Sequence, residues 1–266
     1  MPIIGIDLEK CTNCKDCVNI CVRRNYRIAD EQNQIYFDDS RGCILCGHCI
    51  SICPENAIIY EDMGDEAMEY QKKQSPSELI PYSTLQQFLR TKRSVRKYKE
   101  DKVPKELIEK VLNTMRYAPT GTNRRTMSCH VISNEETIKT LVDSIVEHRE
   151  SEEDIRRLRK LREKGIDTIF YDAPHVLILY SKYLWDSRNA AIAITYGMLS
   201  AHSLGLGTCW IGMAHGTLNE NPKILSEIAG INDQVLAVMT LGYPAVNYFR
   251  APPRPPIETT RLDDKK

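Results

Sequence analysis

The sequence predicts an α+β protein of two domains, a small cysteine-rich domain followed by a larger one. Three observations support this prediction. Eight of the ten cysteines lie between Cys11 and Cys53. The next stretch, residues 61–83, is polar, acidic and interrupted by prolines, which is typical of a connector. From Thr84 onward, helical patterns alternate with short apolar runs. We therefore expect domains at residues 1–60 and 84–266, joined by a linker over 61–83.

The composition is that of a water-exposed globular protein. It contains 36 basic and 36 acidic residues, so no bulk attraction to nucleic acid or to an anionic membrane is expected. Its apolar runs, such as residues 176–180, are too short to span a bilayer. The first ten residues lack the features of a signal peptide, and we therefore expect a cytoplasmic, reducing location. In such a compartment, dense cysteine indicates metal binding rather than disulfides.

The cysteines of the first domain form two copies of one motif. The first copy consists of Cys11, Cys14, Cys17 and Cys21, and the second of Cys43, Cys46, Cys49 and Cys53. A hairpin is expected between them, with residues 27–30 paired against 34–37. Three cysteines at two-residue gaps can wrap three corners of an iron–sulfur cube, while the fourth ligates the other cube.

This pattern assigns four cysteines to each of two [4Fe–4S] clusters. We name them the first cluster, with Cys11, Cys14, Cys17 and Cys53, and the second cluster, with Cys43, Cys46, Cys49 and Cys21. A zinc site is the alternative, but it uses two Cys-x-x-Cys pairs for one ion and explains the doubled run poorly. His48 is interpreted as a bystander or as a hydrogen-bond donor to a ligand. Residues 3–60 resemble a bacterial two-[4Fe–4S] ferredoxin, with Val22 where that family usually has proline.

The second domain is predicted to mix helices and strands. Helices are expected after Pro104, over the charged stretch 135–164 and over the small-residue stretch 189–203; strands are expected at 129–133, 175–180, 208–211 and 235–241. The basic run inside 135–164 is interpreted as a solvated helix face, with a lid over a site as a further hypothesis. No Gly-x-Gly-x-x-Gly motif joins a strand to a helix, which disfavours a Rossmann nicotinamide domain.

Three segments of the second domain stand out. Residues 92–98 concentrate cations and a hydroxyl, which suits a phosphate or the negative charge of a reduced flavin. Residues 118–123 form a polar loop at a helix end, and residues 205–212 form a turn into a strand. Each segment alone is common on protein surfaces or in turns.

Together and in this order, the three segments resemble the FMN-dependent nitroreductase family, from about Thr84 to Pro256. The resemblance implies an α/β/α sandwich that binds FMN. The matching residues are Lys92, Arg93, Ser94, Arg96 and Tyr98; Pro119, Thr120, Gly121 and Asn123, which would reach FMN from the partner subunit; Trp210, Ile211, Gly212 and Met213, with the Gly212 amide at the flavin N5; and Arg254, with Arg250 as a second cation. Lys92 replaces a common arginine, residues 125–127 replace a frequent Gln-Pro-Trp, and Pro252 stands where a lysine is usual.

The combined resemblance implies an oxidoreductase that is a homodimer with two FMN sites at its interface. Electrons would pass from the two [4Fe–4S] clusters to FMN and on to a small acceptor such as a nitroaromatic or a quinone. Alternatives are the reduction of an activated alkene or a carbon–halogen bond, or a redox carrier or sensor without turnover. The electron donor is a ferredoxin or NAD(P)H. No protein acid or base is identified, and His202 and His215 are interpreted as structural.

Overall fold

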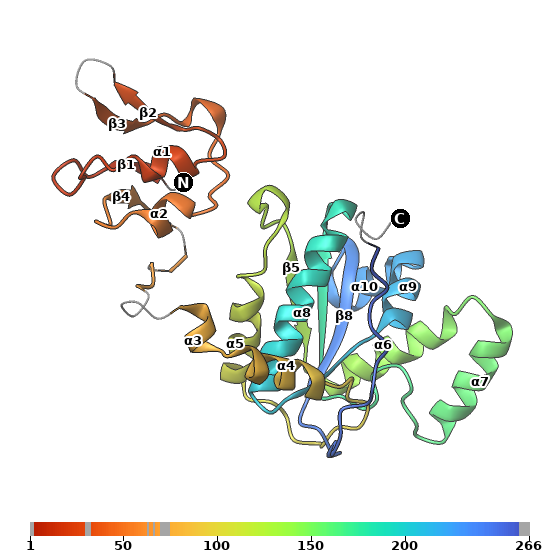
Figure 1. The fold of residues 1–266 in the computed structure, drawn as a ribbon. Coiled ribbons are helices and arrows are strands. Elements are labelled where there is room, and N and C mark those ends of the chain that lie inside the picture. Colours follow the sequence, from red (N-terminus) through yellow and green to blue (C-terminus); the bar gives the residue numbers. More distant parts are fainter. Residues whose placement is uncertain (1–2, 30–32, 63, 66, 70–74, 261–266) are drawn as a thin grey trace. The chain divides into compact units, whose positions relative to one another are not determined.

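The computed structural model describes residues 3–29, 33–62, 64–65, 67–69 and 75–260 (Figure 1). The chain divides into two compact units. Unit 1 comprises residues 1–79 together with the loop 119–125, and unit 2 comprises residues 80–118 and 126–266. Part of the expected linker, at residues 63, 66 and 70–74, lies outside the described residues. Its end is helical, with α3 at Pro76–Leu79 and the start of α4 at Tyr82–Thr91.

Unit 1 consists of two small antiparallel ribbons and two short helices. Its elements are β1 (Ile3–Ile6), α1 (Asp16–Ile20), β2 (Tyr26–Ala29), β3 (Gln34–Phe37), α2 (His48–Ile52) and β4 (Ile58–Tyr60). The predicted hairpin is present as β2 and β3, with Ile28 opposite Ile35; residue 30 lies outside the described part. β1 pairs with β4, so the two ends of the unit meet. A two-stranded ribbon is marginal alone, and the ribbons share a core with Cys17 and Cys49.

Unit 2 contains a four-stranded antiparallel sheet in the order β5-β6-β8-β7. The strands are β5 (Ser128–Ile132), β6 (His175–Ser181), β7 (Gly207–Trp210) and β8 (Gln234–Gly242). Each lies within one residue of the predicted strand at either end. The helices are α5 (Lys105–Met115), α6 (Glu135–Glu147), α7 (Glu152–Glu163), α8 (Ser187–Ser203), α9 (Gly212–Glu220) and α10 (Lys223–Ala229).

The sheet of unit 2 is covered on both faces. Side chains alternate along β6, so Val176 and Ile178 pack into a core with α6, α9 and α10. Leu177 and Leu179 point to the other face and pack with α5 and α8. All four side chains are buried, which explains why β6 reads as a continuous apolar run. The predicted α/β/α sandwich is therefore confirmed. No helix among the described residues is long and apolar enough to cross a membrane.

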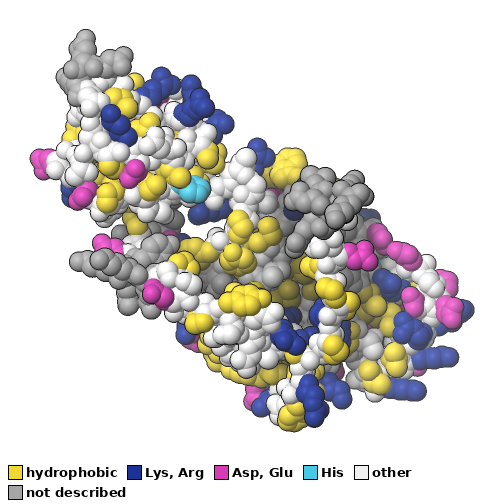
Figure 2. All heavy atoms as spheres, in the orientation of Figure 1, with side chains coloured by type: hydrophobic (Ala, Val, Ile, Leu, Met, Phe, Trp, Pro, Cys, Tyr) yellow, Lys and Arg dark blue, Asp and Glu magenta, His cyan; other side chains and the backbone are white. Residues whose placement is uncertain are grey.

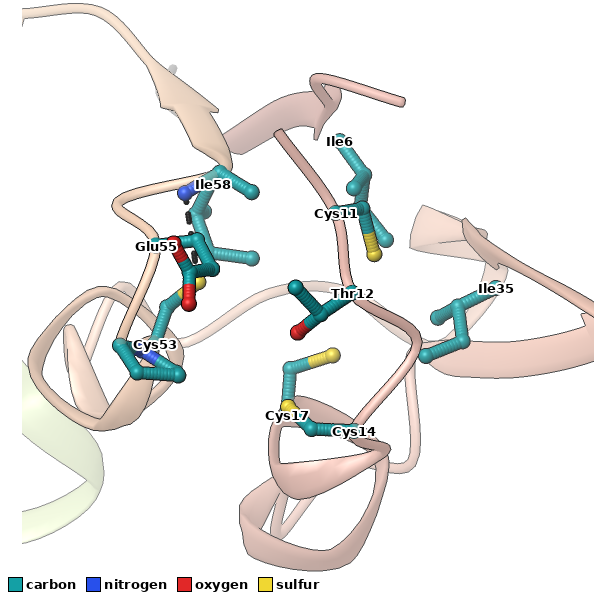
Figure 3. A pocket seen from close by; sticks show the side chains of 11 residues that line it. Ile6, Cys11, Thr12, Cys14, Cys17, Ile35, Cys53, Glu55 and Ile58 are labelled. Atoms are coloured by element: carbon teal, nitrogen blue, oxygen red, sulfur yellow. Dashed lines mark hydrogen bonds between the residues drawn. The ribbon is translucent and has the colours of Figure 1, made fainter. Parts of the chain in front are cut away.

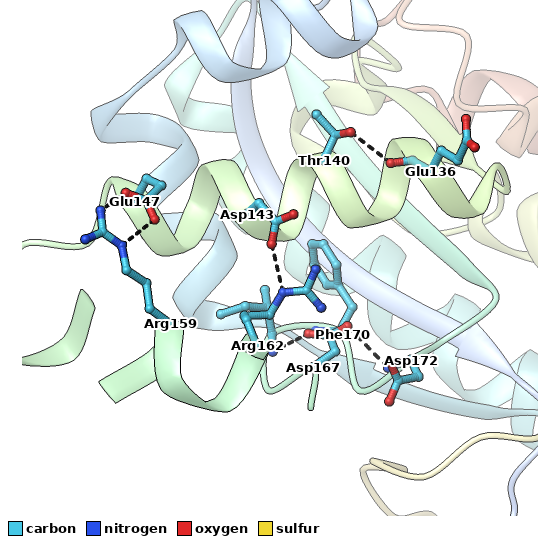
Figure 4. A network of polar contacts seen from close by, with 10 residues as sticks. Glu136, Thr140, Asp143, Glu147, Arg159, Arg162, Asp167, Phe170 and Asp172 are labelled. Atoms are coloured by element: carbon cyan, nitrogen blue, oxygen red, sulfur yellow. Dashed lines mark hydrogen bonds and ion pairs between the residues drawn. The ribbon is translucent and has the colours of Figure 1, made fainter. Parts of the chain in front are cut away.

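The charged stretch 135–164 forms two helices, α6 and α7, with polar contacts between them (Figure 4). Ser151 begins α7 because its hydroxyl accepts a hydrogen bond from the backbone of Asp154. The guanidinium of Arg159 binds the Glu147 carboxylate, and Arg162 binds Asp143 at 2.8 Å. Basic and acidic side chains are mixed along α7 in the space-filling view (Figure 2). Several cations of the run thus hold α7 against α6.

Candidate functional site

A first cavity in unit 1 is ringed by four thiols, those of Cys11, Cys14, Cys17 and Cys53 (Figure 3). The first three come from the loop before α1 and from α1 itself, and Cys53 follows α2. Apolar residues of three strands, Ile6, Ile35 and Ile58, complete the lining. These four thiols are the set that the spacing assigns to the first cluster.

A second cavity in unit 1 is lined by Cys21, Cys43, Cys46 and Cys49, the set assigned to the second cluster. Cys21 follows α1 and the other three belong to the loop before α2 and to α2, so the two cavities have the same construction. His48 also lines the second cavity, beside the thiols rather than in place of one.

Backbone amides donate hydrogen bonds to cysteine sulfurs in both cavities. The amide of Asn25 lies 3.3 Å from the Cys21 sulfur, and the amide of Ala57 lies 3.2 Å from the Cys53 sulfur. Such donors stabilise negative charge on the thiolate. Burial raises the pKa of Cys17 to about 11, so this side chain becomes a ligand when a metal ion displaces its proton.

The arrangement of the thiols suits a cluster better than a single ion. Among the residues described, no three His, Cys, Asp or Glu side chains converge closely enough to hold one metal ion. The thiols instead surround cavities. In a cube each cysteine binds a different iron atom, and the sulfurs therefore stand farther apart than around one zinc ion.

In unit 2, the basic segment 92–98 lies beside strand β7. The Val95 amide donates to the Thr208 carbonyl at 3.0 Å, and Ser94 forms a parallel bridge with Thr208. The approach is close, since a Cβ on Gly207 would stand 2.8 Å from a methyl carbon of Val95. Glycine is therefore required at position 207, and two segments far apart in the sequence are brought together.

Each of these two segments holds a buried polar atom without a partner, although the Arg93 guanidinium also donates to the Arg90 carbonyl. The Nε of Arg93 and the hydroxyl of Thr208 are buried and have no hydrogen-bond partner among the described residues. Burial lowers the pKa of Lys92, with a further contribution from Arg93 and Arg96. Unpaired buried donors are costly in a folded protein. The junction therefore fits an anionic or polar group that is not part of the chain.

The end of β7 leads directly into helix α9. Trp210 closes the strand, the Ile211 amide bonds to Val238 at 2.9 Å, and the helix begins at Gly212. Amides of the first helical turn, including those of Gly212 and Met213, have no acceptor within the helix. Both residues are exposed, and a Cβ at Gly212 would meet open space. This helix start can therefore donate hydrogen bonds to a ligand.

The C-terminal segment returns along the basic segment. The Ala245 amide donates to the Lys97 carbonyl at 2.9 Å, and the Tyr248 hydroxyl donates to the Ser94 carbonyl at 3.4 Å. These contacts place Arg250 two residues beyond an anchored position. Arg254 is exposed and makes no hydrogen bond or ion pair with the described part of the chain.

The loop of Pro119, Thr120, Gly121 and Asn123 is part of unit 1 rather than of the basic junction. The Asn123 side-chain amide donates to the carbonyls of Ile44 and Leu45, at 2.9 and 2.6 Å. These carbonyls belong to the loop between Cys43 and Cys46 of the second cavity. Contact of this loop with FMN from a partner subunit stays a prediction. The sequence contains no local signal for the contact with residues 44 and 45.

Among the residues of the second cavity that were not predicted from the sequence, three carry polar side chains: Arg23, Asn25 and Tyr26. Aligning the two cysteine motifs would have singled them out, because their counterparts in the repeat differ in chemistry. His202 and His215 have structural partners, as expected. His202 contacts the Thr91 hydroxyl, and His215 contacts the Val235 carbonyl at 3.1 Å.

Comparison with known proteins identifies both parts of the chain. Residues 89–243 match the Nitroreductase family, and residues 3–71 match a 4Fe-4S dicluster domain. A protein of Methanothermobacter thermautotrophicus, provisionally named an NADH dehydrogenase/NAD(P)H nitroreductase, is 27% identical over 167 residues; the match covers 60% of this chain and 76% of that protein. An iodotyrosine deiodinase of Hydra vulgaris is 21% identical over 183 residues, covering 60% of this chain and 64% of that protein.

Solved structures agree with this result. A nitroreductase of Bacteroides fragilis with bound FMN is 25% identical and superposes with a TM-score of 0.55, covering 66% of this chain and 98% of that one. A nitroreductase of Desulfitobacterium hafniense shares the fold at 18% identity, with a TM-score of 0.56 over 66% of this chain and 97% of its own. The chain therefore belongs to the nitroreductase family and carries a 4Fe-4S dicluster domain ahead of its family domain.

Proposed function

We propose that this chain is an oxidoreductase that uses two [4Fe–4S] clusters and FMN to reduce a small oxidised acceptor, such as a nitroaromatic compound or a quinone. The observation that carries the proposal is the separation of the eight cysteines into two cavities of four, in the same chain as a nitroreductase-family domain. Such a pairing suits transfer of single electrons to a cofactor that collects two.

The residues of both cavities fit the clusters. Each cavity offers four thiols and at least one backbone amide that donates to a ligand sulfur. A bound cluster supplies a one-electron redox centre. The chain contributes the ligands, an apolar lining that excludes water, and amide donors that stabilise the charge of the reduced state.

The junction of segment 92–98 with β7 fits FMN. Arg93 and Thr208 present buried polar atoms without partners, and Lys92 and Arg96 add positive charge. The Bacteroides fragilis relative, at 25% identity, was solved with bound FMN. A bound flavin supplies two-electron redox chemistry. The chain's cations balance the phosphate and the charge on the reduced ring, and the Gly212 amide at the start of α9 orients the ring.

The assembly and the donor form part of the same proposal. The resemblance places Pro119, Thr120, Gly121 and Asn123 at the FMN of a partner subunit, which implies a homodimer with FMN at the interface. A ferredoxin is the preferred donor because the chain has its own cluster module, and NAD(P)H is the alternative. Mixing the oxidised protein with either reductant under anaerobic conditions and following flavin absorbance identifies the donor.

Anaerobic purification followed by reduction of the clusters tests the proposal. We expect about eight iron atoms and about one FMN per chain, from two cubes and one flavin site. A low-potential one-electron donor that reduces the clusters should bleach the flavin, and a nitroaromatic compound should restore its colour. Cys43→Ala should slow flavin reduction, whereas Cys129→Ala, which removes a thiol outside both cavities, should not. A flavin that stays oxidised beside reduced clusters contradicts the proposal.

A second acceptor class is favoured by one comparison. The Hydra vulgaris relative is named an iodotyrosine deiodinase, which points to reduction of a carbon–halogen bond within this fold. Presenting the reduced protein with nitroaromatic, quinone and halogenated aromatic compounds separates the classes by the rate of flavin reoxidation. Reoxidation by none of them, but by a protein partner, would indicate a redox carrier.

A further inference from the structure

The two halves of unit 1 allow a position-by-position comparison of the two cavities. Every cysteine of the first motif recurs 32 positions later, as Cys11 does in Cys43. The strands follow nearly the same offset, since β3 begins 31 positions after β1 and β4 begins 32 positions after β2. Ile3, which lines the second cavity, thereby corresponds to Ile35, which lines the first. Differences at equivalent positions are therefore differences between the surroundings of the two clusters.

Residues at four equivalent positions differ in chemistry, and at one of them, Thr12 against Ile44, the hydroxyl lies in the first cavity. Arg23, Asn25 and Tyr26 line the second cavity, and their counterparts Glu55, Ala57 and Ile58 line the first. A cation thus replaces an anion, an amide replaces a methyl group, and a phenol replaces an alkyl chain. One backbone donor is shared, because the amides of residues 25 and 57 bond to Cys21 and Cys53 at 3.3 and 3.2 Å. The second cavity has a further donor in the Leu45 amide, which lies 3.4 Å from the Cys43 sulfur.

The hydroxyl of Tyr26 is the most distinctive group of the second cavity. Tyr26 is 3% exposed, and its hydroxyl has no hydrogen-bond partner in the described part of the chain. The Phe37 ring packs against it with centroids 5.2 Å apart and restricts its position. Tyr26 lines the same cavity as Cys49 and the other three thiols of the second cluster. Its hydroxyl is thus a buried donor without a partner among the described residues, beside the ligand set.

Charge reinforces this asymmetry. The Arg23 side chain donates to the Gly42 carbonyl at 3.1 Å and also to the Arg41 carbonyl, so its guanidinium lies along the backbone that leads into Cys43. In the first cavity, Glu55 stands beside Cys53 (Figure 3). Both side chains are exposed, so salt screens their effect more than that of the buried phenol.

We propose that Tyr26 and Arg23 raise the reduction potential of the second cluster above that of the first. Reduction adds one negative charge to a cluster, and a hydrogen-bond donor or a cation nearby stabilises the reduced state. One electron therefore passes from the first cluster to the second. This transfer oxidises the first cluster and reduces the second, and no proton is transferred. This inference rests on the proposed function in that both clusters must be present.

The second cluster is accordingly the outlet of the pair. Its ligand loop is the one whose carbonyls bind Asn123, at residues 44 and 45. Asn123 belongs to the loop in which the sequence predicts flavin contacts. Electrons from a one-electron donor thus enter at the first cluster and leave at the second.

Redox titration of the full holoprotein, followed by electron paramagnetic resonance, tests the proposal. The wild type should show two resolved potentials. Tyr26→Phe removes only the hydroxyl and should lower the higher potential alone. We expect a shift of roughly tenfold in the distribution of one electron between the clusters, or ~59 mV. Tyr36→Phe, at a 45% exposed tyrosine of β3 outside both cavities, is the matched control and should change neither potential.

Two surface variants keep the proposal testable if Tyr26→Phe loses iron. Arg23→Gln should lower the higher potential, and Glu55→Gln should raise the lower one. Equal potentials in the wild type overturn the proposal, as does a Tyr26, Arg23 or Glu55 variant that retains its iron and shifts the opposite cluster or neither. If the potentials are equal while electrons still reach the flavin, this inference fails and the proposed function stands. If they differ while the flavin stays oxidised, the proposed function fails.

Discussion

Replacing Arg93 should weaken FMN binding more than replacing any exposed cation of the same segment. The Nε of Arg93 is buried without a partner among the described residues, although the same guanidinium donates to the Arg90 carbonyl. Lys97 is exposed and binds the C-terminal segment through its backbone carbonyl. A hydrogen bond to a charged group contributes about 1.5–3 kcal/mol. Because about 1.4 kcal/mol corresponds to a tenfold change in affinity, Arg93→Gln should raise the Kd for FMN by roughly 10- to 150-fold.

Arg93→Lys and Lys97→Gln complete this test. Lysine keeps the positive charge but loses the Nε donor and the planar fork, so the loss of affinity should be smaller than for glutamine. Lys97→Gln should change the Kd by less than about threefold, because exposed charges are screened. Flavin fluorescence titrated with apoprotein, at one ionic strength, measures all three. If Arg93→Gln binds FMN as tightly as Lys97→Gln does, the assignment of the junction to the flavin is wrong.

Three further predictions concern stability, each measured by anaerobic urea unfolding of the holoprotein. Asp186 is fully buried and accepts hydrogen bonds from three side chains at 2.6 to 2.8 Å. Asp186→Asn points an amide at these donors and should lower the free energy of unfolding by about 1–3 kcal/mol, and an unchanged free energy would contradict the network. Burial lowers the pKa of His175, whose Nε2 accepts from the Val103 amide at 2.9 Å. Because the unfolded chain then binds the proton more readily, the contribution of His175 to the free energy of unfolding should be constant above pH 6.5 and fall as the pH drops further. His175→Asn should remove this fall, and a variant with the same pH profile as the wild type would contradict the prediction. Glu147→Gln breaks an exposed pair with Arg159 and should cost less than about 1 kcal/mol, so a loss above about 2 kcal/mol would refute a surface role.

Local sequence patterns predicted strands, helices and thiol sets correctly where neighbouring residues alone fix the backbone geometry. The strands of unit 2 were predicted to within one residue, because a buried strand such as β6 requires an unbroken apolar run. The two thiol sets were predicted for a similar reason, since two-residue gaps leave the backbone few ways to present three sulfurs to one centre. The charged helices were also predicted, because their periodicity survives a high charge content.

Contacts between distant segments were not predictable in the same way. The partners of Asn123 at residues 44 and 45 could not be read from either segment, since any exposed carbonyl accepts from an amide. The basic run of α7 is exposed, as interpreted, apart from the half-buried Arg162. The ion pairs of Arg159 and Arg162 with carboxylates of α6 were not predicted. That pairing depends on how two helices pack, which a single helical pattern does not determine.

The sequence by itself therefore determined the two domains, the division of the eight cysteines and the order of the flavin-type segments, because each depends on local spacing. Tertiary structure decided what surrounds those groups. It placed Ser94 beside Thr208, left the Arg93 Nε and the Tyr26 hydroxyl buried without partners among the described residues, and brought Arg23 to the second cavity and Glu55 to the first. Burial and the absence of a partner arise only when distant segments pack together, and these properties set the affinity for a flavin and the potential of a cluster.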